Sequence, residues 1–164
     1  MTPSPDLRQL NGSDGDLLRT ATLTNVNWAG GRRFTYGDID RAPQIRHYYD
    51  FRPDRGDVGF VAEHDRLTVG VVWLLYLDSV DPGYGFVGDG VPELSLTVWS
   101  GYRGQGIGRS LLTAALGEAQ ARGLPRVSLS VEAGNPALFL YRSLGFEPAD
   151  GAPEGTYVVN LERS

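Results

Sequence analysis

The residues best suited to chemistry lie in a glycine-rich run at 100–110, SGYRGQGIGRS, which holds four glycines and two arginines. An alternating apolar segment precedes the run and a segment with helical spacing follows it, so the run predicts a turn from a strand into a helix. The first amides of a helix have no acceptor within the helix, and glycines let a ligand approach them closely. Arg103 and Arg109 add positive charge at either end. The run therefore predicts a site for a phosphate or pyrophosphate.

Two common phosphate-binding motifs do not fit this run. A P-loop requires a lysine, and the chain contains none. The dinucleotide pattern G-x-G-x-x-G, started at Gly104 and Gly106, meets Arg109 at its third glycine, and no acidic residue follows about 20 residues later at the end of a strand. Because the chain has 22 glycines, short glycine patterns also arise by chance. The pattern that remains is R-x-x-G-x-G at 103–108, with a generic nucleotide-binding module as one alternative.

Hydrophobic periodicity predicts the elements that position this loop. Leu94, Leu96 and Val98 alternate with other residues before it, and apolar residues recur at helical spacing from 107 to about 122 after it. A strand at 126–131 follows, so a right-handed crossover between parallel strands is expected. The other predicted elements are strands at 6–10, 57–63, 68–77 and 156–162, helices at 14–25 and 36–50, and a two-turn helix within 135–146.

The R-x-x-G-x-G run resembles the pyrophosphate-binding signature of the GNAT N-acyltransferase superfamily, [R/Q]-x-x-G-x-[G/A]. The resemblance covers 93–146, where the strand, signature, helix, strand and an N-P-A-x-x-L-Y-x-x-x-G-F segment follow the family's order. It implies an α/β fold, α+β in some schemes, with a mixed central sheet of about six to seven strands, splayed between strands 4 and 5, and about four flanking helices. One domain is expected over 1–164, with 1–92 as the acceptor-side half and 93–146 as the acyl-CoA-binding core.

The resemblance also implies that acetyl-CoA binds as the acyl donor, with its pantetheine arm between the splayed strands. A main-chain N–H near Val98 is expected to bind the thioester carbonyl, and Tyr141 to lie near the thioester sulfur. Asn135 is expected beside the pantetheine, although it also fits a helix cap with Pro136 at the first helical position. The implied cofactor-binding residues are Leu96, Thr97, Val98, Arg103, Gly104, Gln105, Gly106, Ile107, Gly108, Arg109 and Asn135.

Acyl transfer to an amine requires the amine to be neutral, and an alkylammonium with a pKa of about 10.4 is neutral in fewer than about one molecule in a thousand at pH 7. Glu93 is the candidate base, because it begins the fourth strand on the face opposite the apolar residues, where family members often carry an acidic residue. The alternatives are that Glu93 only solvates a strand end, and that Asp78, Asp81, Asp89 or a water wire removes the proton. Tyr141 is the candidate acid, through a hydrogen bond to the developing thiolate.

Composition excludes several other classes of function. The chain has no cysteine, which excludes a cysteine acyl-enzyme and thiolate metal sites and favours direct attack by the amine. A net charge of −5 argues against nucleic acid as a partner and favours a cationic small substrate. No apolar run is long enough for a membrane span and no signal peptide is recognised, so a cytoplasmic protein is expected. His47 and His64 have no second ligand at metal spacing, so no metal site is expected.

The predicted function is transfer of an acetyl or other acyl group from acetyl-CoA to a primary amine on a small molecule or peptide. A catalytically silent acyl-CoA-binding or sensing domain is the alternative. Trp28 and the aromatic segment 46–51, RHYYDF, are candidates for an acceptor pocket, but packing of the second helix is the favoured interpretation. The acceptor and the acyl chain length stay open, and a homodimer is a possible state.

Overall fold

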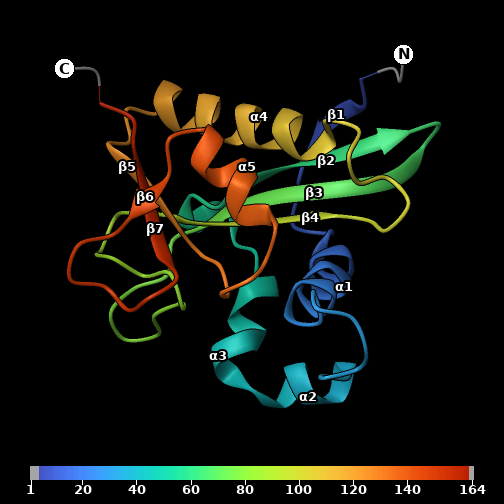
Figure 1. Ribbon diagram of the computed structural model, residues 1–164, viewed down its shortest axis with the longest axis horizontal. Helices are drawn as coiled ribbons and strands as arrows, with labels where there is room; N and C mark the ends of the chain where they lie inside the picture. Colours follow the sequence, from blue (N-terminus) through green and yellow to red (C-terminus); the bar gives the residue numbers. More distant parts are fainter. Residues whose placement is uncertain (1–3, 163–164) are drawn as a thin grey trace.

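The computed structural model describes residues 4–162, so residues 1–3 and 163–164 of the expected domain lie outside the described residues. Its strands are β1 (Asp6–Gln9), β2 (Val58–His64), β3 (Leu67–Leu75), β4 (Glu93–Val98), β5 (Arg126–Ser130), β6 (Glu147–Pro148) and β7 (Thr156–Asn160). They form one seven-stranded sheet in the order β1-β2-β3-β4-β5-β7-β6 (Figure 1). Only β4 and β5 pair in parallel, and all other neighbours are antiparallel. The mixed sheet expected from the sequence is confirmed.

Helices cover both faces of this sheet (Figure 1). They are α1 (Gly15–Val26), α2 (Tyr36–Arg41), α3 (Pro43–Arg46), α4 (Ile107–Ala121) and α5 (Ala137–Ser143), with short 3₁₀ helices η1 (His47–Tyr49) and η2 (Pro53–Arg55). The helices α4 and α5 lie on one face, and α1, α2 and α3 lie on the other. Within residues 4–162, no helix is long and apolar enough to cross a membrane.

The prediction of one helix over 36–50 is wrong. The segment divides into α2, α3 and η1, with Ala42 extended between α2 and α3 at φ −102° and ψ 102°. A proline clashes with the backbone of the residue before it when that residue is helical, so Pro43 forces Ala42 out of the helix. The division brings the number of α-helices within residues 4–162 to five, one more than the approximate count expected.

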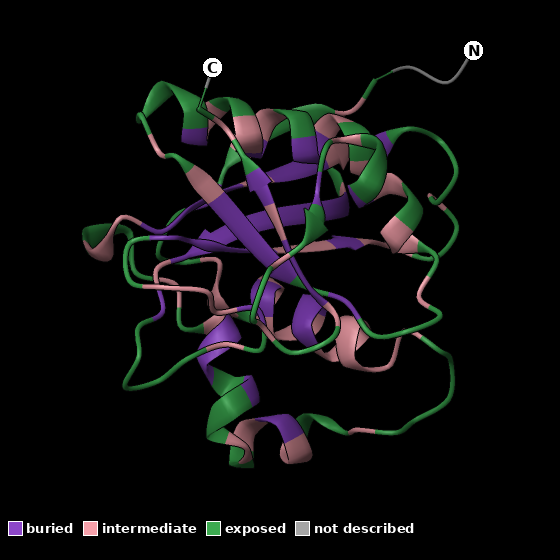
Figure 2. Ribbon diagram, turned by 60° about the vertical axis from the view of Figure 1, so that its left-hand side comes forward, coloured by how far each residue is buried: buried purple, intermediate pink, exposed green. Residues whose placement is uncertain are grey.

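Alternation along β3 gives the protein a separate core on each face of the sheet. Val72 and Leu74 pack beneath α4 and α5, whereas Val71, Trp73 and Leu75 pack against the α1 side. These residues are buried, as is most of the centre of the sheet (Figure 2). A sheet covered on both sides places β4 between two different layers. Side chains of β4 therefore reach α4 and α5 from one face and α1 and η1 from the other.

Candidate active site

The strands β4 and β5 separate after a single pair in register, Glu93 with Ser128. The carbonyl of Pro92 accepts a hydrogen bond from the Ser128 N–H at 3.0 Å. Backbone groups alternate between the two edges of a strand, so those of Leu96 and Val98 face the same edge as Pro92. Across residues 4–162, no strand pairs with β4 at that edge beyond Glu93. The second half of β4 therefore offers the N–H and carbonyl of Leu96 and the N–H of Val98 to the gap, whereas the Val98 carbonyl accepts from Arg103 Nε.

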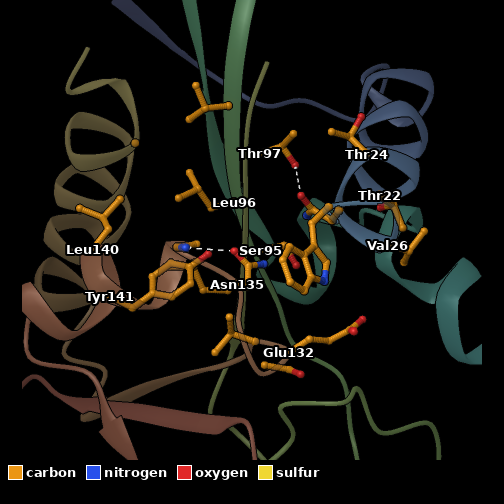
Figure 3. A pocket seen from close by; sticks show the side chains of 18 of the residues that line it. Thr22, Thr24, Val26, Ser95, Leu96, Thr97, Glu132, Asn135, Leu140 and Tyr141 are labelled. Atoms are coloured by element: carbon orange, nitrogen blue, oxygen red, sulfur yellow. Dashed lines mark hydrogen bonds between the residues drawn. The ribbon is translucent and has the colours of Figure 1, made fainter. Parts of the chain in front are cut away.

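A cleft of about 940 Å³ occupies this gap and reaches from α1 to α5 (Figure 3). Twelve of the thirteen predicted site residues line it: Glu93, Leu96, Thr97, Val98, Arg103, Gly104, Gly106, Ile107, Gly108, Arg109, Asn135 and Tyr141. Gln105 does not line it, because this exposed side chain turns back and donates to the Gly101 carbonyl at 3.4 Å. The structure therefore brings the two halves of the predicted site into one cleft.

The start of α4 forms one end of the cleft. Gly106, at φ +83°, is the residue before the helix, and its carbonyl accepts from the Ser110 N–H at 3.0 Å. The N–H groups of Ile107, Gly108 and Arg109 donate to no acceptor in the described part of the chain. A left-handed turn followed by three free amides makes a concave site for an anion. The glycine run thus has the strand-to-helix geometry that its sequence predicted.

Two arginines flank these amides with most of their donors unused. The Arg103 Nε donates to the Val98 carbonyl at 3.2 Å, and Arg109 donates to the Ser143 hydroxyl at 2.9 Å. Both side chains are exposed. A guanidinium has five N–H groups, so each arginine retains donors for a phosphate.

The helix α5 places Tyr141, and the turn before it places Asn135, on the wall of the cleft nearest α4 (Figure 3). Tyr141 is 7% exposed and packs edge-on against Phe146, with ring centroids 5.9 Å apart. Burial raises the pKa of its phenol above the ordinary value near 10, so the hydroxyl remains a donor at neutral pH. The Asn135 Oδ1 accepts from the Ala137 N–H at 3.0 Å, but the predicted capping position is wrong by one residue, because the helix begins at Ala137 and its N-cap is Pro136.

Glu93 lies on the floor of the cleft and is 4% exposed. Its Oε2 accepts from the Tyr48 hydroxyl at 2.5 Å and its Oε1 accepts from the Gly85 N–H at 3.2 Å. Burial raises the pKa of the carboxyl to about 7, and these two hydrogen bonds oppose the rise. The alternative that Glu93 only solvates a strand end is therefore wrong.

The competing acids before β4 lie away from this floor. Asp78, Asp81 and Asp89 are exposed, and none of them lines the cleft. The Asp81 carboxylate instead accepts a hydrogen bond from His47 Nδ1 at 2.9 Å. In the part of the chain that the structure describes, no group of three or more acidic or histidine side chains could hold a metal ion.

Sequence reasoning missed the contacts that hold Glu93 in place. The Tyr48 hydroxyl, which donates to Glu93, also accepts from the Tyr84 N–H at 2.8 Å. A Cβ at Gly83 would overlap Glu93 Oε1, and a Cβ at Gly85 would lie 2.6 Å from the carbonyl carbon of Leu129. Only glycine allows the loop to lie this close to β4 and β5. The glycines themselves were visible in the sequence, but they indicated a turn and gave no sign of this approach.

The aromatic residues of the first half divide between the cleft and the core. Trp28 and Tyr48 line the cleft, whereas His47, Tyr49 and Phe51 do not. Tyr49 and Phe51 pack against the α1-side core, as the favoured interpretation of the segment predicted. Trp28 and Tyr48 line the cleft, as the alternative interpretation allowed, and Tyr48 also belongs to the α1-side core.

Comparisons with known proteins agree with this architecture. A model described as the Acetyltransferase (GNAT) family matches residues 23–146. A GNAT-family acetyltransferase from Staphylococcus aureus Mu50 has a TM-score of 0.70 and 19% identity, over 96% of this chain and 99% of that chain. The yncA protein of Salmonella typhimurium, solved with its cofactor acetyl-CoA, has a TM-score of 0.68 and 21% identity, over 99% of this chain and 96% of that chain.

A ribosomal-protein-alanine N-acetyltransferase from Brucella melitensis is 27% identical, with a TM-score of 0.63, over 93% of this chain and 96% of that chain. Among curated protein sequences, none matches this chain. The match at 23–146 covers most of the sequence and includes both the glycine loop and the Tyr141 segment. This chain belongs to the GNAT acetyltransferase family.

Proposed function

We propose that this protein transfers an acetyl group from acetyl-CoA to a primary amine, and that the amine attacks the thioester directly. One observation carries the proposal. A single cleft joins a free edge of β4, the free amides at the start of α4 and a buried carboxylate whose pKa is near neutrality. These are the three features that an acyl donor, its phosphates and an amine to be deprotonated require.

The residues of the cleft fit acetyl-CoA along its length. The amides of Ile107, Gly108 and Arg109 suit the pyrophosphate, since they are free and lie at the positive end of a 15-residue helix. The free N–H and carbonyl of Leu96 and the free N–H of Val98 suit the amides of the pantetheine arm and the thioester carbonyl. The yncA relative was solved with acetyl-CoA, which supports the same donor here.

Glu93 is the proposed general base. At a pKa of about 7, close to half of the molecules carry an ionised carboxylate at neutral pH, which is the best compromise between availability and basicity. An alkylammonium entering the cleft has a pKa of about 10.4, so it must lose a proton before it can attack. Because Glu93 is nearly buried and lines the cleft, the proton has a short path to it.

Tyr141 and the edge of β4 are proposed to act on the other side of the reacting carbon. Bound acetyl-CoA supplies a thioester. The amine nitrogen forms a C–N bond with its carbonyl carbon as the C–S bond breaks. A free N–H of β4 stabilises negative charge on the carbonyl oxygen. The Tyr141 hydroxyl donates a hydrogen bond to the departing sulfur, and the proton of the product thiol comes from the nitrogen, because a phenol is a weaker acid than a thiol.

A thiol-release assay with purified protein, acetyl-CoA and a library of primary amines tests this function. We expect release with at least one amine and a loss of about 10²-fold to 10⁴-fold in Glu93→Gln. Protection from heat by CoA without release by any amine would instead show a silent acyl-CoA-binding domain. Protection by ATP or NAD but not by CoA would show a generic nucleotide-binding module.

A further inference from the structure

The part of the cleft on the α1 side of β4 is lined by side chains that are not among those proposed to bind acetyl-CoA. We call it the acceptor chamber and define it by Thr22, Trp28, Phe34, Tyr48, Tyr84 and Glu93, all of which line the cleft. Thr22 lies on the α1 wall, opposite Ser95 and Thr97 on β4 (Figure 3). An amine that passes a proton to Glu93 must occupy this chamber, so its walls determine which amines fit.

Four of the six residues that define the chamber are aromatic. Trp28 and Phe34 come from the segment after α1, Tyr48 from η1, and Tyr84 from the loop before β4. The Tyr48 and Tyr84 rings stack with an interplanar angle of 12° and centroids 6.2 Å apart. Aromatic faces attract an ammonium and pack well against flat apolar groups. The chamber is therefore suited to a cation attached to a ring or to another bulky apolar group.

The charges beside the chamber favour one positive charge and disfavour a carboxylate. Arg33 is the one cationic residue that lines this side of the cleft within residues 4–162, and it pairs with Glu132 through two hydrogen bonds of 2.8 and 3.3 Å. That pair has no net charge, so the ionised Glu93 carboxylate sets the net charge of this side of the cleft. An acceptor with a carboxylate would meet a negative site and an arginine that is already occupied.

The same ion pair limits the length of the acceptor. It joins the segment before α2 to the end of β5, two walls of the cleft that are 99 residues apart in the chain. The Glu132 side chain extends from the end of β5 toward the α1 side (Figure 3). A polyamine or a peptide that leaves the chamber on this side would have to separate the pair. A short acceptor would not.

A buried hydroxyl indicates where the acceptor can carry a neutral polar substituent. Thr22 is 3% exposed, and its hydroxyl has no hydrogen-bond partner among the described residues. The Trp28 Nε1–H is also buried, but it interacts with the Glu132 carboxylate, and after the larger effect of Arg33 it lowers the pKa of that acid. An unpaired buried hydroxyl is costly, so a ligand oxygen beside Thr22 is favourable. One hydroxyl or ether group on the acceptor would satisfy it.

We propose that the acceptor is a short primary monoamine on an aromatic or similarly bulky apolar group, without a carboxylate. This inference rests on the proposed function. Suitable probes are 2-phenylethylamine and its 4-hydroxyl derivative, compared with phenylalanine, which adds a carboxylate, and spermidine, which adds length and charge. We expect kcat/KM for either arylalkylamine to exceed that for phenylalanine or spermidine by at least about tenfold.

A matched pair of variants tests the charge argument. Glu132→Gln leaves Arg33 without its partner, so the ratio of kcat/KM for phenylalanine to that for 2-phenylethylamine should rise at least about fivefold. The double variant Arg33→Gln/Glu132→Gln removes both charges and should leave the ratio within about twofold of the native value. An unchanged ratio in Glu132→Gln would contradict the role given to the pair.

Direct binding separates failure of this inference from failure of the proposed function. Calorimetric titration of the CoA-bound protein with 2-phenylethylamine should show saturable binding that Trp28→Leu weakens at least about threefold. Preferred turnover of spermidine or phenylalanine by the native protein would overturn the inference and leave the acetyltransferase function intact. Binding of 2-phenylethylamine without thiol release from any amine would instead overturn the proposed function and keep the chamber's selectivity.

Discussion

Replacing Tyr48 with phenylalanine tests whether ionisation of Glu93 limits the reaction. The Tyr48 hydroxyl donates to Glu93 Oε2 at 2.5 Å, and this hydrogen bond lowers the pKa of the carboxyl, against the larger effect of burial. Phenylalanine keeps the ring and removes the donor, so the ionised carboxylate retains only the Gly85 N–H. The pKa of Glu93 should therefore rise further above its ordinary value.

The structure also sets the size of this effect. A hydrogen bond to a charged group contributes about 1.5 to 3 kcal/mol, and about 1.4 kcal/mol corresponds to one pKa unit. The acidic limb of the rate profile should therefore move up by about one to two pH units. Starting from a pKa of about 7, the ionised fraction at pH 7 then falls from about one half to between about 10% and 1%, and kcat/KM falls about fivefold to fiftyfold.

The assay is kcat/KM for one amine from about pH 5 to about pH 10, measured by thiol release with saturating acetyl-CoA. Tyr49→Phe is the matched control, because the Tyr49 hydroxyl also donates to a carboxylate, Asp40 Oδ1 at 2.5 Å, but does not line the cleft. Its profile should match that of the native protein, and Tyr48→Phe should recover the native rate at high pH. A Tyr48→Phe profile superimposable on the native one would refute Glu93 as the limiting base.

Three further predictions concern the acid, the anion site and stability. Tyr141→Phe should lower kcat by no more than about 10²-fold to 10⁴-fold with little change in CoA affinity; an unchanged kcat would exclude the hydroxyl from the reaction. Gly106→Val should weaken CoA binding at least about tenfold in calorimetry, because φ is +83° there, whereas Gly117→Ala, where a Cβ meets nothing within 4 Å, should bind normally and raise Tm. In urea unfolding, the contribution of Glu93 should lower the free energy of unfolding by about 3 kcal/mol as pH rises from about 4.5 to about 7. Over that window the carboxyl is ionised in the unfolded protein and protonated in the folded protein. The variant Glu93→Gln should lack this pH dependence.

The donor half of the site was predictable because its determinants are contiguous in the chain. Leu96 and Val98 set the edge of β4, and the free amides follow within about one turn of α4, so one short segment contains both the pattern and the geometry. The segment around Tyr141, which resembles the family's next motif, follows α4 after the single strand β5. Local periodicity therefore predicted the strand, the turn and the helix, and the resemblance to the family supplied the expected roles of the individual residues.

The acceptor half was less predictable because its contacts join distant segments. Tyr48 and Glu93 are 45 residues apart, and their contact depends on the break that Pro43 introduces before η1. The turn between β2 and β3, in contrast, was predicted from local sequence, since HDR separates two strands expected to form a hairpin, and β2 and β3 pair antiparallel. Tertiary packing brings Tyr48 to Glu93, and no local pattern expressed that contact.

The environment of Glu93 explains why the loop before β4 must contain glycine. Two donors keep the pKa of this buried carboxyl near 7, and one of them is the backbone N–H of Gly85. That amide reaches the carboxylate because Gly83 and Gly85 have no side chains to hold the loop away from β4 and β5. A larger residue at either position would withdraw the donor and shift the loop, which would raise the pKa and displace Tyr84 from the acceptor chamber. The loop therefore couples the basicity of Glu93 to the shape of the acceptor site, although its acids Asp78, Asp81 and Asp89 do not line the cleft.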